Sequence, residues 1–396
     1  MKNNLSDRII PLSSIDHIFT GTGSYTIEFI FAYQEKLDDK SLRSSLLEVI
    51  KHFPPVSSKL VKLTDKEYGF ELSSEGLVFE VQESSVRFEE NDAKYDYINP
   101  VNTLEGDPLT KIKVTHTPGG SVLGVSISHA IADGFSYFHF LSSWAKFYQG
   151  RSFFPPIHQR TLLVSNQDKL QKNPVVSQDV LRDAGLFLED KRKVIKKEDL
   201  KWESRIFRFA ELKELLAQEQ KNTDTRLSFN DIITAQLSKE YLSKWQAGGQ
   251  DDTCYISCPV DFRRILEGFP KTYFGNAVSL ATTALSLEEL NSISLSDLAL
   301  RIRTNVKKVD RKRIETNLSC LTVLRNQQNI NIFENLHVMH PDSGLLVTNL
   351  SRLPVPEIEF NAGPPSDYSI LTQTVRGAVI LPHPDGFEVR LCCPID

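Results

Sequence analysis

The sequence has little cysteine, and what it has suggests neither disulfides nor a metal site. There are 5 cysteines among 396 residues, an odd number in apolar surroundings. They are Cys254, Cys258, Cys320, Cys392 and Cys393. This usage predicts free thiols in a reducing compartment. The first two come closest to metal-ligand spacing, but no second pair accompanies them, so we expect no metal.

Long apolar runs, a basic excess and internal repeats are also missing. No stretch approaches the roughly 20 apolar residues of a membrane span, so none is expected. The opening residues 1–7 are polar, unlike a signal peptide, and we expect a cytoplasmic protein. A net charge of -5 offers no basic face for nucleic acid, and we expect no such partner. Repeats and low-complexity tracts, which would indicate a solenoid or a linker array, do not occur.

The pattern that is present predicts mixed strands and helices. Residues 24–32 and 109–128 are rich in β-branched and aromatic side chains, the second around a Pro118-Gly119-Gly120 turn. Residues 39–52 and 134–149 have the apolar spacing of amphipathic helices. The later elements expected are helices at 228–246 and 294–309 and strands at 253–260, 276–285, 344–350, 372–381 and 386–393.

Between about residues 150 and 201 this pattern weakens, with prolines and many charges, which is typical of a crossover between domains. The length also favours two domains. We therefore predict an α/β fold of mixed α+β layers in two halves. Their expected extents are 1–185, including the crossover, and 186–396.

The most informative segment runs from Ser128 to Gly134 and reads SHAIADG. It follows a predicted strand and precedes a predicted helix, a place where a side chain can be held rigidly. A neutral imidazole at His129 could take a proton near neutral pH. The alternative is an ordinary core histidine. Asp133 could orient the imidazole or form a structural ion pair, and Gly134 fits either unusual backbone angles or close packing.

HAIADG resembles the HxxxDG motif of the BAHD acyltransferases and of the wider coenzyme A-dependent acyltransferase superfamily, which includes chloramphenicol acetyltransferase and condensation domains. Other resemblances occur in the family's order along nearly the whole chain. They are the LSxxD-like segment Pro11–Asp16, the turn Phe53-Pro54-Pro55, the helix start Leu227–Asp231, the VDxR-like Val260–Arg263 and the YFGN-like Tyr273–Asn276.

The resemblance implies two chloramphenicol-acetyltransferase-like domains with an active-site channel between them. His129 is then the general base, and Asp133 faces away from the substrate to pair with Arg263. Ser228 and Asn276 are expected on the donor side. Thr348 and Asn349 stand where relatives often have Thr-Ser; they are candidates to stabilise the oxyanion, with a strand-end cap as the alternative.

Two departures from the family pattern stand out. The DFGWG element reads Glu359-Phe360-Asn361-Ala362-Gly363 here, and this motif is regarded as structural. Leu350 stands where plant relatives often have tryptophan, which argues against a flat phenolic acceptor.

The sequence thus predicts an acyltransferase for groups other than aminoacyl groups. Acyl-CoA is the expected co-substrate, no permanently bound cofactor is expected, and the acceptor is a small-molecule alcohol or amine. No covalent acyl-enzyme is needed. The alternatives are a condensation-like enzyme with an acyl carrier protein as donor, or a catalytically silent binding module of the same fold. Each chain carries both halves of the channel, so a monomer is expected.

Overall fold

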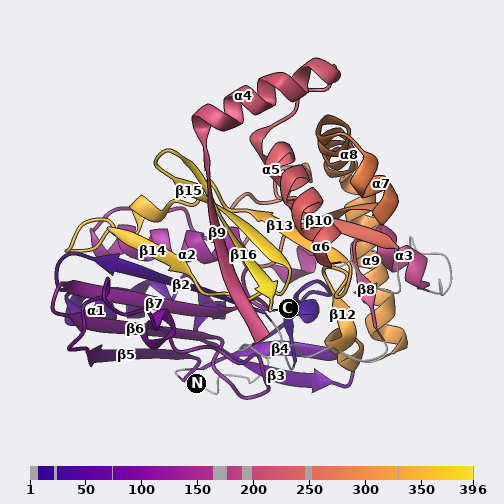
Figure 1. The fold of residues 1–396 in the computed structure, drawn as a ribbon. Helices are drawn as coiled ribbons and strands as arrows, with labels where there is room; N and C mark the ends of the chain where they lie inside the picture. Colours follow the sequence, from indigo (N-terminus) through magenta and orange to yellow (C-terminus); the bar gives the residue numbers. More distant parts are fainter. Residues whose placement is uncertain are drawn as a thin grey trace.

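The computed structural model describes residues 8–21, 25–73, 75–163, 176–189, 199–245, 252–328 and 330–395. Two large sheets organise these residues, one built mainly from the first half of the chain and one from the second (Figure 1). No helix among them is both long and apolar enough to cross a membrane.

The first large sheet has five strands in the order β14-β2-β7-β6-β5. Its strands are antiparallel except for the β5/β6 pair. Helices α1 and α2 share a hydrophobic core with this sheet. The bounds are β2 Thr26–Tyr33, α1 Asp39–Val49, β5 Leu77–Glu83, β6 Thr110–Thr117, β7 Gly120–Ser128, α2 Gly134–Tyr148 and β14 Asp367–Ile370.

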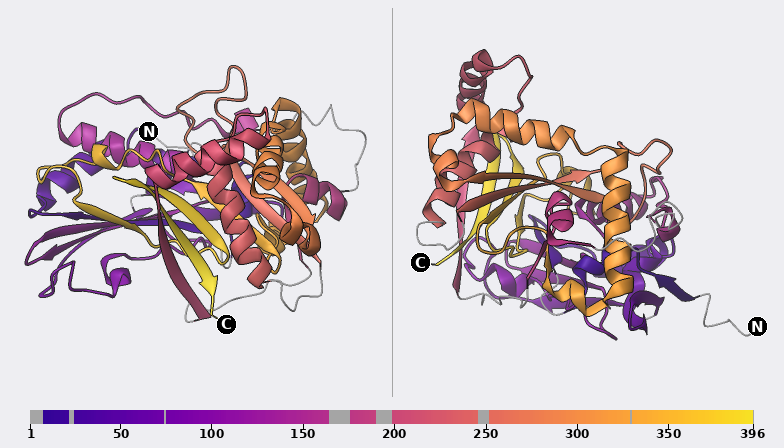
Figure 2. Two further views of the ribbon diagram at one scale, coloured as in Figure 1. Left: turned by 45° about the horizontal axis from the view of Figure 1, so that its top comes forward. Right: turned by 90° about the vertical axis from the view of Figure 1, so that its right-hand side faces the viewer.

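The second large sheet has six strands in the order β11-β10-β13-β15-β16-β9. Helices α5, α8 and α9 lie with it on the other side of the molecule from α1 and β5 (Figures 1 and 2). The strands are β9 Leu200–Arg208, β10 Thr253–Asp261, β11 Val278–Ser286, β13 Gly344–Asn349, β15 Gly377–His383 and β16 Gly386–Pro394. The helices are α3 Gln178–Asp183, α4 Phe209–Glu219, α5 Phe229–Leu237, α6 Ser243–Trp245, α7 Leu287–Ser292, α8 Leu295–Lys307 and α9 Arg311–Gln327.

Smaller elements complete the fold. β1 (Ile9–Pro11), β4 (Glu67–Leu72) and β3 (Ser58–Thr64) form a three-stranded sheet, and β8 (Phe187–Leu188) pairs with β12 (Leu336–His337). The short helical turns are η2 Asp16–Phe19, η3 Pro54–Ser57, η4 Lys94–Tyr97, η5 Arg160–Leu163, η8 Gln220–Asn222, η10 Ile330–Asn335 and η11 Val355–Glu357, and a π-helical turn, η9 Ser238–Leu242, joins α5 to α6.

The predicted mixture of α and β layers is confirmed, and one strand connects the two halves. β14 lies beyond residue 185 in sequence, yet it pairs with β2 at the edge of the first sheet. The sheets therefore do not divide strictly at the proposed boundary between residues 185 and 186, which stays a prediction. Residues 164–175 and 190–198 of the predicted crossover lie outside the described residues.

Some elements differ from the sequence expectation. The strand expected at 372–381 begins only at Gly377, after Arg376 adopts a left-handed backbone with φ 57°. The edge strand β9 and the helix α9 carry many charged residues, which weaken the apolar periodicity used to predict elements, and neither was predicted.

The altered DFGWG element packs against the first half of the chain. The Phe360 ring lies 5.0 Å from the Trp144 ring of α2, between centroids. Asn361 accepts a hydrogen bond from the Asp38 backbone N–H at 3.0 Å and donates one to the Lys36 carbonyl at 3.0 Å. The substituted segment therefore packs against α2 and the residues before α1. None of these contacts involves His129.

Candidate active site

His129 lies at the turn between β7 and α2, where the sequence predicted it. Its backbone N–H donates to the Tyr25 carbonyl at 3.2 Å. The Phe19 ring stacks on the imidazole, with centroids 4.0 Å apart and planes inclined by 22°. His129 as a whole is half-buried, while its Nδ1 atom is fully enclosed. The imidazole is thus held between elements that are far apart in sequence.

The surroundings keep the imidazole neutral. Burial lowers the pKa of His129 below its ordinary value of 6.5. The Asp133 carboxylate, the backbone carbonyl of His129 itself and the side chain of Asn276 act in the opposite direction but do not reverse that shift. A histidine with a lowered pKa is unprotonated at neutral pH, so it can accept a proton.

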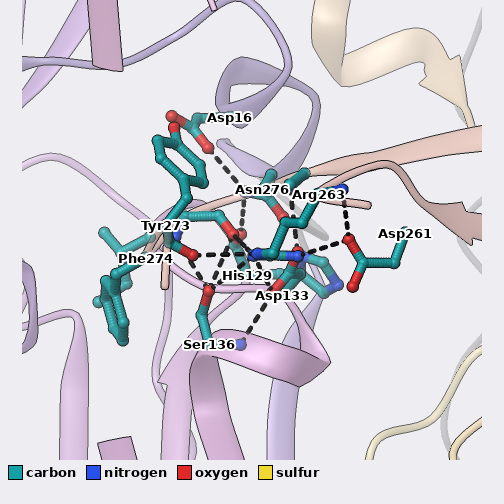
Figure 3. A network of polar contacts seen from close by, with 12 residues as sticks. Asp16, His129, Asp133, Ser136, Asp261, Arg263, Tyr273, Phe274 and Asn276 are labelled. Atoms are coloured by element: carbon teal, nitrogen blue, oxygen red, sulfur yellow. Dashed lines mark hydrogen bonds and ion pairs between the residues drawn. The ribbon is translucent and has the colours of Figure 1, made fainter. Parts of the chain in front are cut away.

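Asp133 is turned toward the second half of the chain. Its carboxylate lies 2.8 Å from Nη2 of Arg263, and both side chains are almost completely buried. It also accepts from the Ala277 backbone N–H at 3.0 Å and from the Ser136 N–H at 2.9 Å, so it caps α2. These partners place Asp133 as a support of the turn that carries His129 (Figure 3).

Arg263 connects this turn to several backbone oxygens. Its Nε donates to the Tyr273 carbonyl at 3.1 Å, and Nη2 donates to the Gly275 carbonyl at 2.9 Å and to the Ser136 hydroxyl at 3.1 Å. The guanidinium also lies over the Phe135 ring, 4.5 Å from its centroid. Both halves of the chain therefore contribute contacts to the turn that carries His129.

Gly134 is explained by close packing rather than by backbone strain. It is not among the described residues with positive φ. A Cβ at this position would lie 3.3 Å from Cδ2 of Leu350, tighter than ordinary van der Waals contact. The segment that follows β13 therefore packs against the start of α2, beside the His129 turn.

A second buried ion pair, which was not predicted from the sequence, lies near His129. Nε of Arg160 is 2.9 Å from the Asp16 carboxylate, and both side chains are buried. Arg160 also donates to the Ile131 carbonyl at 3.1 Å and to the Phe274 carbonyl. Asp16 belongs to the LSxxD-like segment, but Arg160 lies in the weakly patterned stretch after residue 150. The pairing of Arg160 with Asp16 is recognised only in the fold, which brings the two side chains together.

Asn276, expected on the donor side, is completely buried. Its amide Nδ2 donates to Asp16 Oδ1 at 2.7 Å and to the His129 carbonyl at 2.8 Å. These contacts favour a positioning role for Asn276 over direct contact with a donor.

Thr348 and Asn349 end β13, as the sequence predicted. The Asn349 amide donates to Asn230 at 2.8 Å, and its oxygen accepts from the Ser351 N–H at 3.0 Å. Thr348 is half-buried, and its hydroxyl has no hydrogen-bond partner within the described ranges. Of the two, Thr348 has the hydroxyl that is free to donate to a ligand.

A basic pocket of about 820 Å³ lies at the start of α5. Ser228 caps that helix in a capping box with Asp231 and lines the pocket. Three arginines line it as well: Arg226, Arg303 and Arg352. Guanidinium groups and a helix N-terminus both favour anionic groups such as phosphate.

A small apolar cavity of about 50 Å³ is lined in part by Phe19. It is lined mainly by aliphatic side chains, including Ile18, Leu280 and Leu318. Phe19 thus contacts both the imidazole and this cavity. As for metals, no group of three or more histidine, cysteine, aspartate or glutamate side chains within the described residues could hold an ion.

The fold is shared with solved structures that cover nearly the whole chain. The structure of F. graminearum TRI101 complexed with ethyl coenzyme A superimposes with a TM-score of 0.78, covering 98% of this chain and 95% of that one at 16% identity. Vinorine synthase gives a TM-score of 0.71, covering 97% and 89% at 19% identity.

Sequence comparison gives the family. Residues 2–394 match the model described as the Transferase family, and the chain belongs to this family, the BAHD-type acyltransferases. It is 24% identical to omega-hydroxypalmitate O-feruloyl transferase of Arabidopsis thaliana, covering 85% of this chain and 75% of that protein. It is 26% identical to hydroxycinnamoyl-CoA:5-hydroxyanthranilate N-hydroxycinnamoyltransferase of Avena sativa, covering 83% and 77%. The chain is accordingly a non-aminoacyl acyltransferase, as its sequence predicted.

Proposed function

We propose that this protein transfers an acyl group from acyl-CoA to a hydroxyl or amine of a small molecule, with His129 as general base. The observation that carries the proposal is the His129 turn. A neutral imidazole, half-buried against Phe19, is held there by contacts from both halves of the chain. The relatives named above, an O-transferase and an N-transferase, support both kinds of acceptor.

The reaction follows from these groups. The acceptor's oxygen or nitrogen attacks the thioester carbonyl carbon while its proton passes to His129. The hydroxyl of Thr348 donates a hydrogen bond to the resulting oxyanion. The carbon–sulfur bond then breaks, and the proton on the imidazole passes to the departing thiolate of coenzyme A. All atoms are accounted for without a covalent bond between the acyl group and the protein.

The basic pocket supports coenzyme A over a carrier protein as donor. Arg226, Arg303 and Arg352 line it together with Ser228. Free coenzyme A carries phosphate groups that such a cluster binds well. Ser228 stays a candidate donor contact, and we assign the phosphate contacts to these arginines. Because one chain supplies both halves of the site, we propose that a monomer is active.

The test is thiol release from a panel of acyl-CoAs, with and without pooled alcohols and amines. The wild type should release coenzyme A in an acceptor-dependent manner, and His129→Ala should lose this activity. A matched control is His139→Ala, because burial also lowers the pKa of this α2 histidine, which bonds to the Phe154 carbonyl at 2.9 Å.

The outcomes separate the alternatives. Full turnover by His129→Ala, with true acceptors present, contradicts the role of His129. Release from carrier-protein thioesters but from no acyl-CoA contradicts the proposed donor. Binding of acyl-CoA without turnover across the whole panel indicates the silent binding module.

A further inference from the structure

Two carbonyl oxygens of the His129 turn are held by side chains from outside it. The Ile131 carbonyl accepts a hydrogen bond from Nη2 of Arg160 at 3.1 Å, and the His129 carbonyl accepts one from Nδ2 of Asn276 at 2.8 Å. The Asp133 carboxylate is held separately, at the end of the same turn. The beginning and the middle of the turn therefore have a support of their own.

Arg160 is connected to both of these carbonyl contacts. The Nε atom of its guanidinium lies 2.9 Å from the Asp16 carboxylate. Asp16 in turn accepts from Nδ2 of Asn276 at 2.7 Å, and Figure 3 shows this contact beside the His129 turn. The side chains of all three residues are buried. Arg160 thus reaches the turn directly at Ile131 and, through Asp16 and Asn276, at His129.

The same carboxylate also anchors the apolar cover of the imidazole. Asp16 begins η2 and Phe19 ends it, and the Phe19 ring stacks on His129 with centroids 4.0 Å apart. The Asp16 carboxylate accepts from the Ser13 backbone N–H at 3.0 Å and from the Ser13 hydroxyl at 2.7 Å. Holding Asp16 in place therefore also holds the short turn whose other end covers the imidazole.

The Tyr273–Asn276 segment packs directly against the Arg160 guanidinium. Nη1 of Arg160 donates to the Phe274 carbonyl. Gly275 adopts a φ of 152°, which favours glycine, and a Cβ there would collide with the guanidinium. One planar group thus contacts this segment and the first half of the chain at once, which the single nitrogen of a lysine does not reproduce.

We propose that Arg160 is a positioning residue that sets the place of the His129 imidazole. With Asp16 it holds the backbone of the turn and the segment that carries Phe19, so the imidazole is fixed through its backbone and at its ring face. Acyl transfer should be sensitive to this, because misplacing a catalytic group by about 1 Å can cost a reaction roughly 100-fold in rate. This inference rests on the proposed role of His129 as general base.

The kinetic test is Arg160→Lys, which keeps the positive charge but loses the planar set of donors. It should lower kcat about 10- to 100-fold, because the imidazole no longer meets the acceptor's proton in the right place. KM for acyl-CoA should hardly change, since Arg160 is not among the residues that line the basic pocket.

Proton NMR of the His129 ring reports its place without any turnover. The ring current of a stacked Phe19 moves protons over its face upfield, and Phe19→Ala supplies the reference without this effect. In Arg160→Lys the ring protons of His129 should move from their wild-type positions toward that reference. Failure of the proposed function is recognised separately, as wild-type protein that keeps the upfield shift but transfers no acyl group.

Arg390→Lys is the matched control, because Arg390 of β16 makes a partly buried ion pair with Glu388, at 2.8 Å, outside this network. It should leave kcat and the His129 ring protons unchanged. If Arg160→Lys does not fold by circular dichroism, Ser13→Ala takes its place, since it loosens Asp16 without leaving a buried charge unpaired. Wild-type kcat or unmoved ring protons in the folded variant overturn the proposal, and so do equal changes in the control.

Discussion

The Phe19 ring lies flat against the imidazole of His129, with 4.0 Å between the ring centroids. Asp16 begins η2 and Phe19 ends it, so one short turn supplies both an apolar cover for the imidazole and a carboxylate near the His129 turn. The apolar cover excludes water from one face of the imidazole, and this exclusion favours the neutral ring.

Replacing Phe19 should therefore change the pH dependence of activity. Burial lowers the pKa of His129, so Phe19→Ala, which opens that face to water, should raise it toward the ordinary value. Because the base must be unprotonated, the acidic limb of the kcat/KM profile should move to higher pH. Phe88→Leu, a change in a separate buried cluster, serves as control. An unmoved acidic limb in Phe19→Ala contradicts this account of the pKa.

Removing one member of the buried Asp133–Arg263 pair should lower the free energy of unfolding. Arg263→Met leaves the buried Asp133 carboxylate without its cation, and we expect a loss of about 3–5 kcal/mol in the free energy of unfolding. Asp133→Asn should cost less, because Arg263 keeps an ion pair with the Asp261 carboxylate at 3.1 Å. The double variant should lose less than the sum of the two. Urea denaturation of the four proteins measures this.

Lys36→Met is the control for that series, because the Lys36–Glu83 pair is exposed at the surface. It should leave the free energy of unfolding almost unchanged, because water and salt screen an exposed pair. Strict additivity of the two buried substitutions would show that the pair carries no coupling.

Substitution of the arginines in the basic pocket should weaken only the binding of the donor's phosphate groups. Arg352→Ala and Arg226→Ala should each raise KM for acyl-CoA about tenfold, equivalent to ~1.4 kcal/mol, and the effect should weaken with added salt. An acyl-pantetheine thioester lacks the nucleotide phosphates, so its KM should hardly change. Arg264→Ala, an exposed arginine outside the pocket, is the control. An equal rise in KM for acyl-CoA and for acyl-pantetheine would show that the phosphates bind outside the basic pocket.

Acid should destabilise the fold through His17. Burial lowers the pKa of His17 to about 4, and its Nε2 accepts from the Tyr68 backbone N–H at 2.9 Å. Between the unfolded value of 6.5 and about 4, the unfolded chain binds the extra proton, so stability is full above 6.5 and falls as pH decreases. The loss attributable to this group is about 3 kcal/mol.

His17→Gln should flatten the stability profile over this range, as measured by chemical denaturation at a series of pH values. His158→Gln provides a comparison, because burial lowers the pKa of His158 to about 4 as well. A wild-type profile that is flat between pH 6.5 and 4 contradicts the prediction.

Several residues of the site could be predicted from the sequence because they lie in short, recognisable segments. His129, Asp133 and Gly134 lie in one turn between a strand and a helix, and Arg263 lies in a second recognisable segment. Arg160 was missed because nothing near it in sequence indicates that it meets Asp16. The buried contacts of Asn276 were not predicted for the same kind of reason, since its partners come from two distant segments. Long-range polar contacts leave no periodic signal in the chain.

The secondary structure was also predicted best where the signal is local. Strands with alternating or continuous apolar residues, such as β7 and β10, were predicted closely. β14 has only four residues, and its place beside β2 is decided by tertiary pairing rather than by its own sequence.

That pairing has a consequence for synthesis of the protein. Ribosomes make a chain from its N-terminus, so β2 and β7 emerge long before residues 367–370. Until then one edge of β2 has no neighbouring strand, and an open edge can recruit other chains. The nascent protein is therefore most prone to aggregate before its last strands have been synthesised. Truncation before residue 367 should yield insoluble protein, even though the residues of the His129 turn are all present.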